Sequence, residues 1–214
     1  TGLCALCLSA ILSLPATANA VVISEILYDA SGTDIGNVFV ELFGVPGADL
    51  SGWSLQGING GDGAVYKSVA LSGFIPIDGV FVIGDLLTGG GTNIINSDLI
   101  VSVDFQNGPD SVRLLNGATL IDAVGYGDFT GQVFAGEGVA AVDPAAGSSL
   151  MRLNPLADTD NNFTDFAVLN VQTPGTVPSL ATVPLPASLY LLGSGFAAML
   201  TTRRRRAQET RRKG

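Results

Sequence analysis

An apolar stretch near the C-terminus limits what this chain can fold into. Residues 185–202 are 18 residues without a charged side chain, and Arg203, Arg204, Arg205 and Arg206 follow them. A segment that is apolar on every face can satisfy its backbone in lipid as a helix. At this length the helix would span about 27 Å, close to the roughly 30 Å of a bilayer core. The stretch therefore predicts a single transmembrane helix, with a buried core helix as the alternative.

The residues that flank this helix predict its orientation. The four arginines stay on the cytoplasmic side by the positive-inside bias. Val183-Pro184-Leu185-Pro186-Ala187 opens the segment, and its prolines cannot continue a strand or a helix, so they hold an extended peptide. We therefore expect this pentapeptide at the non-cytoplasmic end of the helix, where the membrane meets water. A membrane protease could reach it there.

A Pro-containing motif, a short apolar helix and an arginine cluster in this order resemble the PEP-CTERM class of protein-sorting tails, in the VPLPA variant. The resemblance covers residues 183–214 and implies recognition by an exosortase, an integral-membrane cysteine protease or transpeptidase of Gram-negative bacteria. It implies an inner-membrane intermediate, followed by delivery to the cell surface or extracellular matrix. The chain departs from such tails in a longer end, which adds Arg211, Arg212 and Lys213.

The first 20 residues predict a secretory signal peptide. Residues 2–14 are apolar or small, a proline follows, and Ala18-Asn19-Ala20 supplies the small residues of an A-x-A cleavage site. We expect a signal helix, export by the Sec machinery and cleavage after Ala20. The basic n-region is expected upstream of Thr1. A lipoprotein signal is rejected because a leucine precedes each cysteine, where a lipobox needs a small residue.

Residues 21–177 remain for a folded domain, and 178–182 form a spacer. Both cysteines lie in the signal peptide and the chain has no histidine. The domain therefore lacks a thiolate nucleophile, a zinc–thiolate site and the usual histidine-based triads.

The charge of the exported part is strongly negative. Residues 21–183 contain 18 acidic side chains and three basic ones, Lys67, Arg113 and Arg152, which gives a net charge of −15. A field of this sign repels nucleic acid and anionic lipid and attracts divalent cations. Nucleic acid is therefore excluded as an expected partner.

The domain sequence predicts short strands separated by turns. No long stretch keeps an apolar period of 3.6 residues, which favours an all-β sandwich over a helical fold. Val38, Val40 and Leu42 are expected on one face of a strand, and Asn116-Gly117 between two apolar runs predicts a hairpin. The expected strands are residues 21–28, 37–43, 50–55, 65–71, 80–83, 99–105, 111–115 and 119–124.

Several pieces of this domain form a set. The most specific is Leu50-Ser51-Gly52-Trp53, and the others are residues 23–28, 39–43, 79–84, 110–115, 121–127, 158–166 and 173–175. Together they resemble the lamin-tail domain, an immunoglobulin-like β-sandwich found on secreted and cell-surface bacterial proteins. The resemblance implies a structural, adhesive or binding module, whose polysaccharide or protein ligand the sequence does not name. After residue 43 the chain departs from the Asn-Pro turn common in such domains.

The best candidate for chemistry is a run of oxygen-bearing side chains. Asp158, Asp160 and Asn162 alternate as in the opening of a calcium loop, which predicts a Ca²⁺ site. Phe163 and Leu169 then stand where an EF-hand needs glycine and glutamate. Asx turns explain the same residues without a metal. No other cofactor is predicted.

Enzymatic activity is not expected, although carboxylates are plentiful. Glu25 and Glu41 could serve a two-carboxylate glycosidase; the alternative is that they hydrogen-bond neighbouring groups where strands cross. Trp53 is interpreted as a core anchor, with an exposed binding platform as the alternative. Asp110 and Asp122 are interpreted as ordinary turn and strand-end residues. Two functional alternatives remain open: a carboxylate-dependent secreted hydrolase, and a permanently anchored single-pass membrane protein.

Overall fold

The computed structural model describes residues 21–176 of the chain. This part contains ten β-strands and one four-residue helix. The strands are short and joined by glycine-rich turns, as the sequence predicts. The elements are β1 (Val22–Leu27), β2 (Phe39–Phe43), β3 (Trp53–Asn59), β4 (Val65–Ala70), β5 (Val80–Gly84), β6 (Leu99–Ile100), β7 (Asp110–Asn116), β8 (Thr119–Tyr126), β9 (Ser149–Arg152), α1 (Asn162–Asp165) and β10 (Phe166–Leu169).

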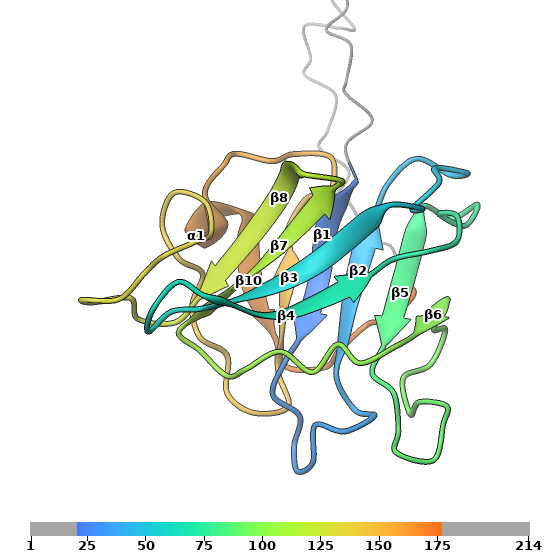
Figure 1. Ribbon diagram of the computed structural model, residues 1–214, viewed down its shortest axis with the longest axis horizontal. Helices are drawn as coiled ribbons and strands as arrows, with labels where there is room; N and C mark the ends of the chain where they lie inside the picture. The colour runs from blue at the N-terminus through green and yellow to red at the C-terminus, as the bar shows by residue number, and fades with distance from the viewer. Residues whose placement is uncertain (1–20, 177–214) are drawn as a thin grey trace, which may run out of the picture. The chain divides into compact units, whose positions relative to one another are not determined.

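The strands form two sheets that lie in two layers (Figure 1). The six-stranded sheet has the order β10-β9-β1-β2-β5-β6, and the four-stranded sheet has the order β4-β3-β7-β8. The β5–β6 pair is parallel, and the other strand pairs are antiparallel. The prediction of an all-β domain is confirmed for residues 21–176.

The larger apolar core lies between the two sheets. Ile26, Val40 and Ile83 of the six-stranded sheet belong to the same buried cluster as Leu55 and Leu114 of the four-stranded sheet. Full burial of an aliphatic side chain of this size contributes about 1.5–3 kcal/mol to stability. The packing of the two sheets against each other therefore accounts for most of the apolar burial.

Strand β1 contains a bulge that turns two consecutive side chains away from this core. Its register with β2 shifts between Ile23 and Glu25. Ile23 and Ile26 both lie in the core between the sheets, so Ser24 and Glu25 lie on the outer face of the six-stranded sheet. Ser24 Oγ accordingly reaches the carboxylate of Glu41 on the same outer face.

A second apolar cluster covers the outer face of the six-stranded sheet. It contains Val38, whereas Val40 and Leu42 lie in the core between the sheets. The prediction that these three side chains share a face is therefore wrong. Val38 precedes the first residue of β2, so the alternation of the strand does not extend to it. The cluster consists of Leu27, Ala30, Val38, Phe39, Val80 and Val82, with Phe43 and Ile94 packed against it.

Some strand bounds differ from the prediction. The strand expected at 50–55 is shifted and forms β3, and the strand expected at 99–105 ends at Ile100. The N–H groups of Val103 and Asp104 donate instead to the buried carboxylate of Asp85, at 2.8 and 3.1 Å. The sequence pattern also missed β9 and β10.

The hairpin predicted at Asn116-Gly117 is confirmed. Asn116 of β7 pairs with Thr119 of β8, which leaves Gly117 and Ala118 as the loop. Gly117 has a φ of 59°, a left-handed conformation that glycine adopts at little cost.

The terminal predictions lie outside the described residues. These are the signal peptide at 1–20, the spacer at 178–182 and the sorting signal at 183–214. Across residues 21–176, no helix has the length and apolar character needed to cross a membrane.

Gly60→Ala should destabilise the domain. A Cβ at position 60 would strike the backbone carbonyl oxygen of Pro109, and backbone cannot move aside cheaply, so we expect a loss of about 1–3 kcal/mol in the free energy of unfolding. Gly89→Ala is the matched control, because a Cβ at position 89 has no heavy atom within 4 Å. Chemical denaturation measures both variants. Equal stabilities would contradict the close approach of the two loops.

Candidate functional site

Arg152 on β9 is the centre of a buried cluster of charges. Its Nη2 contacts both carboxylate oxygens of Asp122 at 2.8 Å. Its Nη1 lies 3.3 Å from an oxygen of Asp158 and 3.3 Å from an oxygen of Asp165. The arginine side chain is 0% exposed. Because an unpaired buried charge would be costly, the surrounding carboxylates are what permits this burial.

Asp122 and Arg152 connect strands of both sheets. Asp122 on β8 accepts the N–H of Ile23 on β1 at 2.6 Å, and Arg152 Nε donates to the Ile23 carbonyl at 2.9 Å. The guanidinium also lies 4.6 Å from the ring centroid of Phe166. Asp122 is fully buried within β8, so its interpretation as a strand-end residue is wrong. It joins the edge strand of the four-stranded sheet to the six-stranded sheet.

Glu137 adds a further carboxylate to this cluster. Asp122, Glu137 and Asp158 each place one oxygen within 4.8 Å of the others. Burial, followed by repulsion from Asp122 and Asp158, raises the pKa of Glu137 to about 8. Its Oε2 is buried and has no hydrogen-bond partner within residues 21–176. These oxygens could hold a divalent cation, but that cation would compete with the Arg152 guanidinium for Asp122.

Asn162, the first residue of α1, pairs with the outer edge of β8. Its Oδ1 accepts the N–H groups of Gly125 and Glu137 at 2.8 and 2.9 Å, and its Nδ2 donates to the carbonyl of Ala123 at 2.7 Å. The side chain is fully buried. The polar atoms of the Asn162 side chain therefore hydrogen-bond backbone groups of β8 and the backbone N–H of Glu137.

The predicted calcium residues Asp158, Asp160 and Asn162 have different surroundings. Asp158 Oδ1 accepts the N–H of Asp160 at 3.2 Å, which is the Asx-turn hydrogen bond of the alternative interpretation. Asp160 is exposed and has a φ of 52°, a conformation that aspartate adopts more readily than most residues. The Asx turn is present, and calcium binding by these three residues stays a prediction.

Glu25 on β1 and Glu41 on β2 are cross-strand neighbours on the outer face of the six-stranded sheet. They are 1% and 0% exposed. Glu25 accepts hydrogen bonds from Ser149 Oγ at 2.6 Å and from Thr173 Oγ1 at 2.8 Å. The Glu25 carboxylate, which the sequence suggests as a glycosidase group, thus accepts hydrogen bonds from two hydroxyl groups.

Glu41 has two donors of its own. Oε1 accepts the Ser24 hydroxyl at 2.7 Å and Oε2 accepts the N–H of Gly175 at 2.8 Å. These hydrogen bonds favour the ionised form, but burial outweighs them and raises the pKa of Glu41 to about 7, with repulsion from Glu25 and Asp78 in the same direction. Both glutamates therefore hydrogen-bond neighbouring groups where strands cross. This is the alternative to a glycosidase role that the sequence offers.

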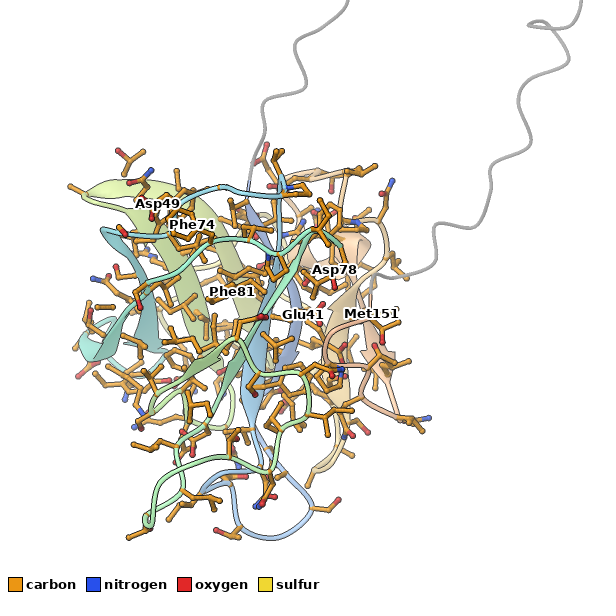
Figure 2. The ribbon with its side chains drawn as sticks, turned by 90° about the vertical axis from the view of Figure 1, so that its right-hand side faces the viewer. Glu41, Asp49, Phe74, Asp78, Phe81 and Met151 are labelled. Carbon is orange, nitrogen blue, oxygen red and sulfur yellow. The ribbon has the colours of Figure 1, made fainter. Side chains whose placement is uncertain are left out.

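A cleft of about 390 Å³ is lined in part by Gly175, the residue whose N–H donates to Glu41. Asp78, which lies above Glu41 in Figure 2, is one of its two acidic lining residues, and Asp98 is the other. Their carboxylates would disfavour an anionic ligand. The lining residues are Pro76, Asp78, Val80, Asn96, Ser97, Asp98 and Gly175.

Trp53 and Asp110 contribute to the fold. Trp53, at the start of β3, is partly buried and packs against the core between the sheets, in agreement with its interpretation as a core anchor. Asp110, the first residue of β7, is buried and accepts the N–H of Gly60 at 2.8 Å. It therefore fixes the turn that follows β3.

Sequence reasoning did not identify Arg152 or Glu137 as members of a site. Arg152 carries a usable signal, because it is one of three bases in residues 21–183 and stands between the apolar Met151 and Leu153. A lone charge in an apolar run indicates a buried partner. Glu137 lies in a glycine-containing loop, where no local pattern distinguishes it.

In comparisons with known proteins, no protein-family model matches the chain and no curated protein matches it. The functional argument therefore rests on the residues described above and on the terminal motifs.

Arg152→Met should destabilise the domain by about 3–5 kcal/mol, because it leaves the buried Asp122 carboxylate without its cation. Arg113→Met is the matched control: Arg113 Nε donates to the Ala135 carbonyl at 3.2 Å, a bond worth about 0.5–1.5 kcal/mol. Adding Asp122→Leu to Arg152→Met should recover part of the loss by removing the buried charge. Denaturant unfolding measures all three, and equal losses in the two single variants would contradict the central role of Arg152.

Glu137→Gln should reduce the fall in stability that occurs between about pH 4.5 and pH 8. Since folding raises the pKa of Glu137 to about 8, its favourable contribution is complete below about pH 4.5 and is lost as the pH rises through 8. The variant should therefore melt at a higher temperature than the parent protein at pH 8.5, with a smaller difference at pH 5. Asp128→Asn is the control, because hydrogen bonds from Thr130 lower the pKa of that exposed carboxyl. A parallel pH profile for parent and Glu137→Gln would disprove the assignment.

Proposed function

We propose that this protein is an exported, non-enzymatic β-sandwich, held for a time in the inner membrane by its C-terminal tail and then released to the cell surface or extracellular matrix by an exosortase. The observation that carries the proposal is how the folded domain ends. Thr173 and Gly175 are hydrogen-bonded to the six-stranded sheet, and six residues, 177–182, separate the described domain from Val183. So few residues between the folded domain and the apolar tail would keep the domain close to the membrane. This suits a substrate that is cut at the membrane surface.

The finer assignment to an immunoglobulin-like, lamin-tail sandwich is part of the same proposal. The sequence pieces that carry the resemblance coincide with regular elements: residues 23–28 overlap β1, 39–43 are β2, and 121–127 overlap β8. The stretch 158–166 holds α1 and two of the three acidic partners of Arg152, Asp158 and Asp165. The stretches that carry the resemblance therefore lie in the strands and the helix of the domain, which supports the proposed assignment.

A structural, adhesive or binding role is favoured over catalysis. The Glu25–Glu41 pair is buried and accepts hydrogen bonds from Thr173 and Gly175. Glycosidase carboxylates must instead reach the scissile bond of a bound sugar. Surface polysaccharide or protein is the proposed ligand class, and the Sec machinery and an exosortase are the proposed processing partners.

Replacing Pro184 and Pro186 with alanine should leave the precursor in the inner membrane, because the pentapeptide loses its enforced extended conformation. The parent protein should end near Pro186 and lack the helix and arginines. Pro178→Ala in the spacer is the matched control and should be processed normally. Membrane fractionation and intact mass spectrometry of the surface-released protein measure both outcomes.

Two results would overturn this proposal in favour of its alternatives. Released protein that still contains peptides from Arg203 onward would favour a permanently anchored protein, because cleavage removes those residues. Turnover of a polysaccharide that Glu25→Gln or Glu41→Gln abolishes would favour a carboxylate-dependent hydrolase.

A further inference from the structure

Near the end of the described residues, Thr173 to Gly175 lie across the Glu25–Glu41 pair. We call these three residues the strap. Thr173 donates its N–H at 3.2 Å and its hydroxyl at 2.8 Å to Glu25, and Gly175 donates its N–H at 2.8 Å to Glu41. Asn96 Nδ2 fastens the middle of the strap by donating to the Pro174 carbonyl at 3.0 Å. The strap is thus attached by polar contacts to residues more than 70 positions earlier in the chain.

Among the described residues, no base forms a salt bridge with the carboxylates beneath the strap. Each of the three salt bridges found within residues 21–176 involves Arg152. The charged groups that act on Glu41 are Glu25 from β1 and Asp78 from the turn before β5, and Asp98 lines the adjacent cleft with Gly175. All of these groups are acidic, so ionisation of Glu41 adds a negative charge to a site that is already negative.

We propose that the strap and the Glu25–Glu41 pair form a pH-sensitive clasp, which is closed while Glu41 holds a proton and opens when the Glu41 carboxylate is ionised. A carboxyl that is shielded from water and lies beside a second carboxylate resists ionising. Opening the strap lets water reach Glu41 and lowers this resistance. When Glu41 is protonated, one of its oxygens can still accept a hydrogen bond from the Gly175 N–H. Its O–H group can donate a hydrogen bond to the Ser24 hydroxyl oxygen.

The direction of the pH dependence follows from the raised pKa of Glu41, about 7 against an ordinary 4.5. The strap is part of the cover that buries Glu41, so Glu41 binds its proton more tightly with the strap closed than with it open, and the closed state loses this preference as the pH rises through 7. The closed strap can make the hydrogen bonds from Thr173 and Gly175 in either protonation state, so closed and open forms coexist. The open fraction therefore increases gradually as the pH rises.

The consequence for the tail rests on the proposed function. Opening the strap releases residues 173–175 from the sheet, and three extended residues add about 10 Å to the reach of the chain that precedes Val183. A membrane protease would gain access to the pentapeptide that begins at Val183 more readily when the strap is open.

Amide hydrogen exchange of the full chain in detergent micelles tests the clasp itself. After correction for the intrinsic exchange rate, protection of the Gly175 amide should fall by about tenfold or more between pH 5 and pH 8, because each pKa unit corresponds to a factor of ten. The amide of Leu42 in β2 is the internal reference and should change little. In Glu41→Gln, which cannot ionise, protection of Gly175 should be the same at both pH values.

An unchanged Gly175 protection in the parent protein, or an equal fall in Glu41→Gln, would overturn the clasp. Thr173→Val provides a second test that leaves the core intact: loss of its hydroxyl bond to Glu25 should lower strap protection at both pH values, and unchanged protection would also overturn the proposal. Because exchange is measured without processing, failure of tail cleavage would reject the proposed function while leaving this result standing.

Discussion

The Arg152–Asp122 ion pair is the interaction on which the junction of the two sheets depends. It contacts both backbone groups of Ile23 on β1 while its carboxylate comes from β8 of the other sheet. A buried ion pair of this kind adds little net stability over apolar residues of similar volume, because desolvation offsets most of the attraction. We infer that its contribution is specificity. It fixes which strand edges meet, and the carboxylates of Asp158 and Asp165 complete the surroundings that make the buried guanidinium tolerable.

The use of Arg152 at this junction leaves the rest of an acidic domain with few cations. Of the 18 acidic side chains in residues 21–183, several are buried, and only Lys67 and Arg113 remain as other bases. Buried carboxylates elsewhere are therefore satisfied by neutral donors. Asp85 accepts backbone N–H groups, and the Glu25–Glu41 pair accepts hydroxyl and backbone donors. Neutral donors satisfy lone pairs without cancelling charge, so burial still raises the pKa of Glu41 despite its two hydrogen bonds.

Both features are completed by the last part of the domain. β9 supplies Arg152, α1 supplies Asn162 for the edge of β8, and the strap covers the outer face of β1 and β2. Strands formed early in the chain thus remain partly unsatisfied until residues 149–175 have joined them.

The sequence by itself determined the strand-rich class, most strand positions and the hairpin at Gly117, because apolar alternation and turn residues act over a few neighbouring positions. It also singled out Glu25 and Glu41, but not what surrounds them. Only the tertiary structure decided that Thr173 covers Glu25 from 148 positions away and that Arg152 pairs with Asp122 across 30 positions. The physical reason is register: the bulge at Ser24 sends two consecutive side chains to one face. A one-residue change of this kind alters which groups meet, and no local pattern encodes it.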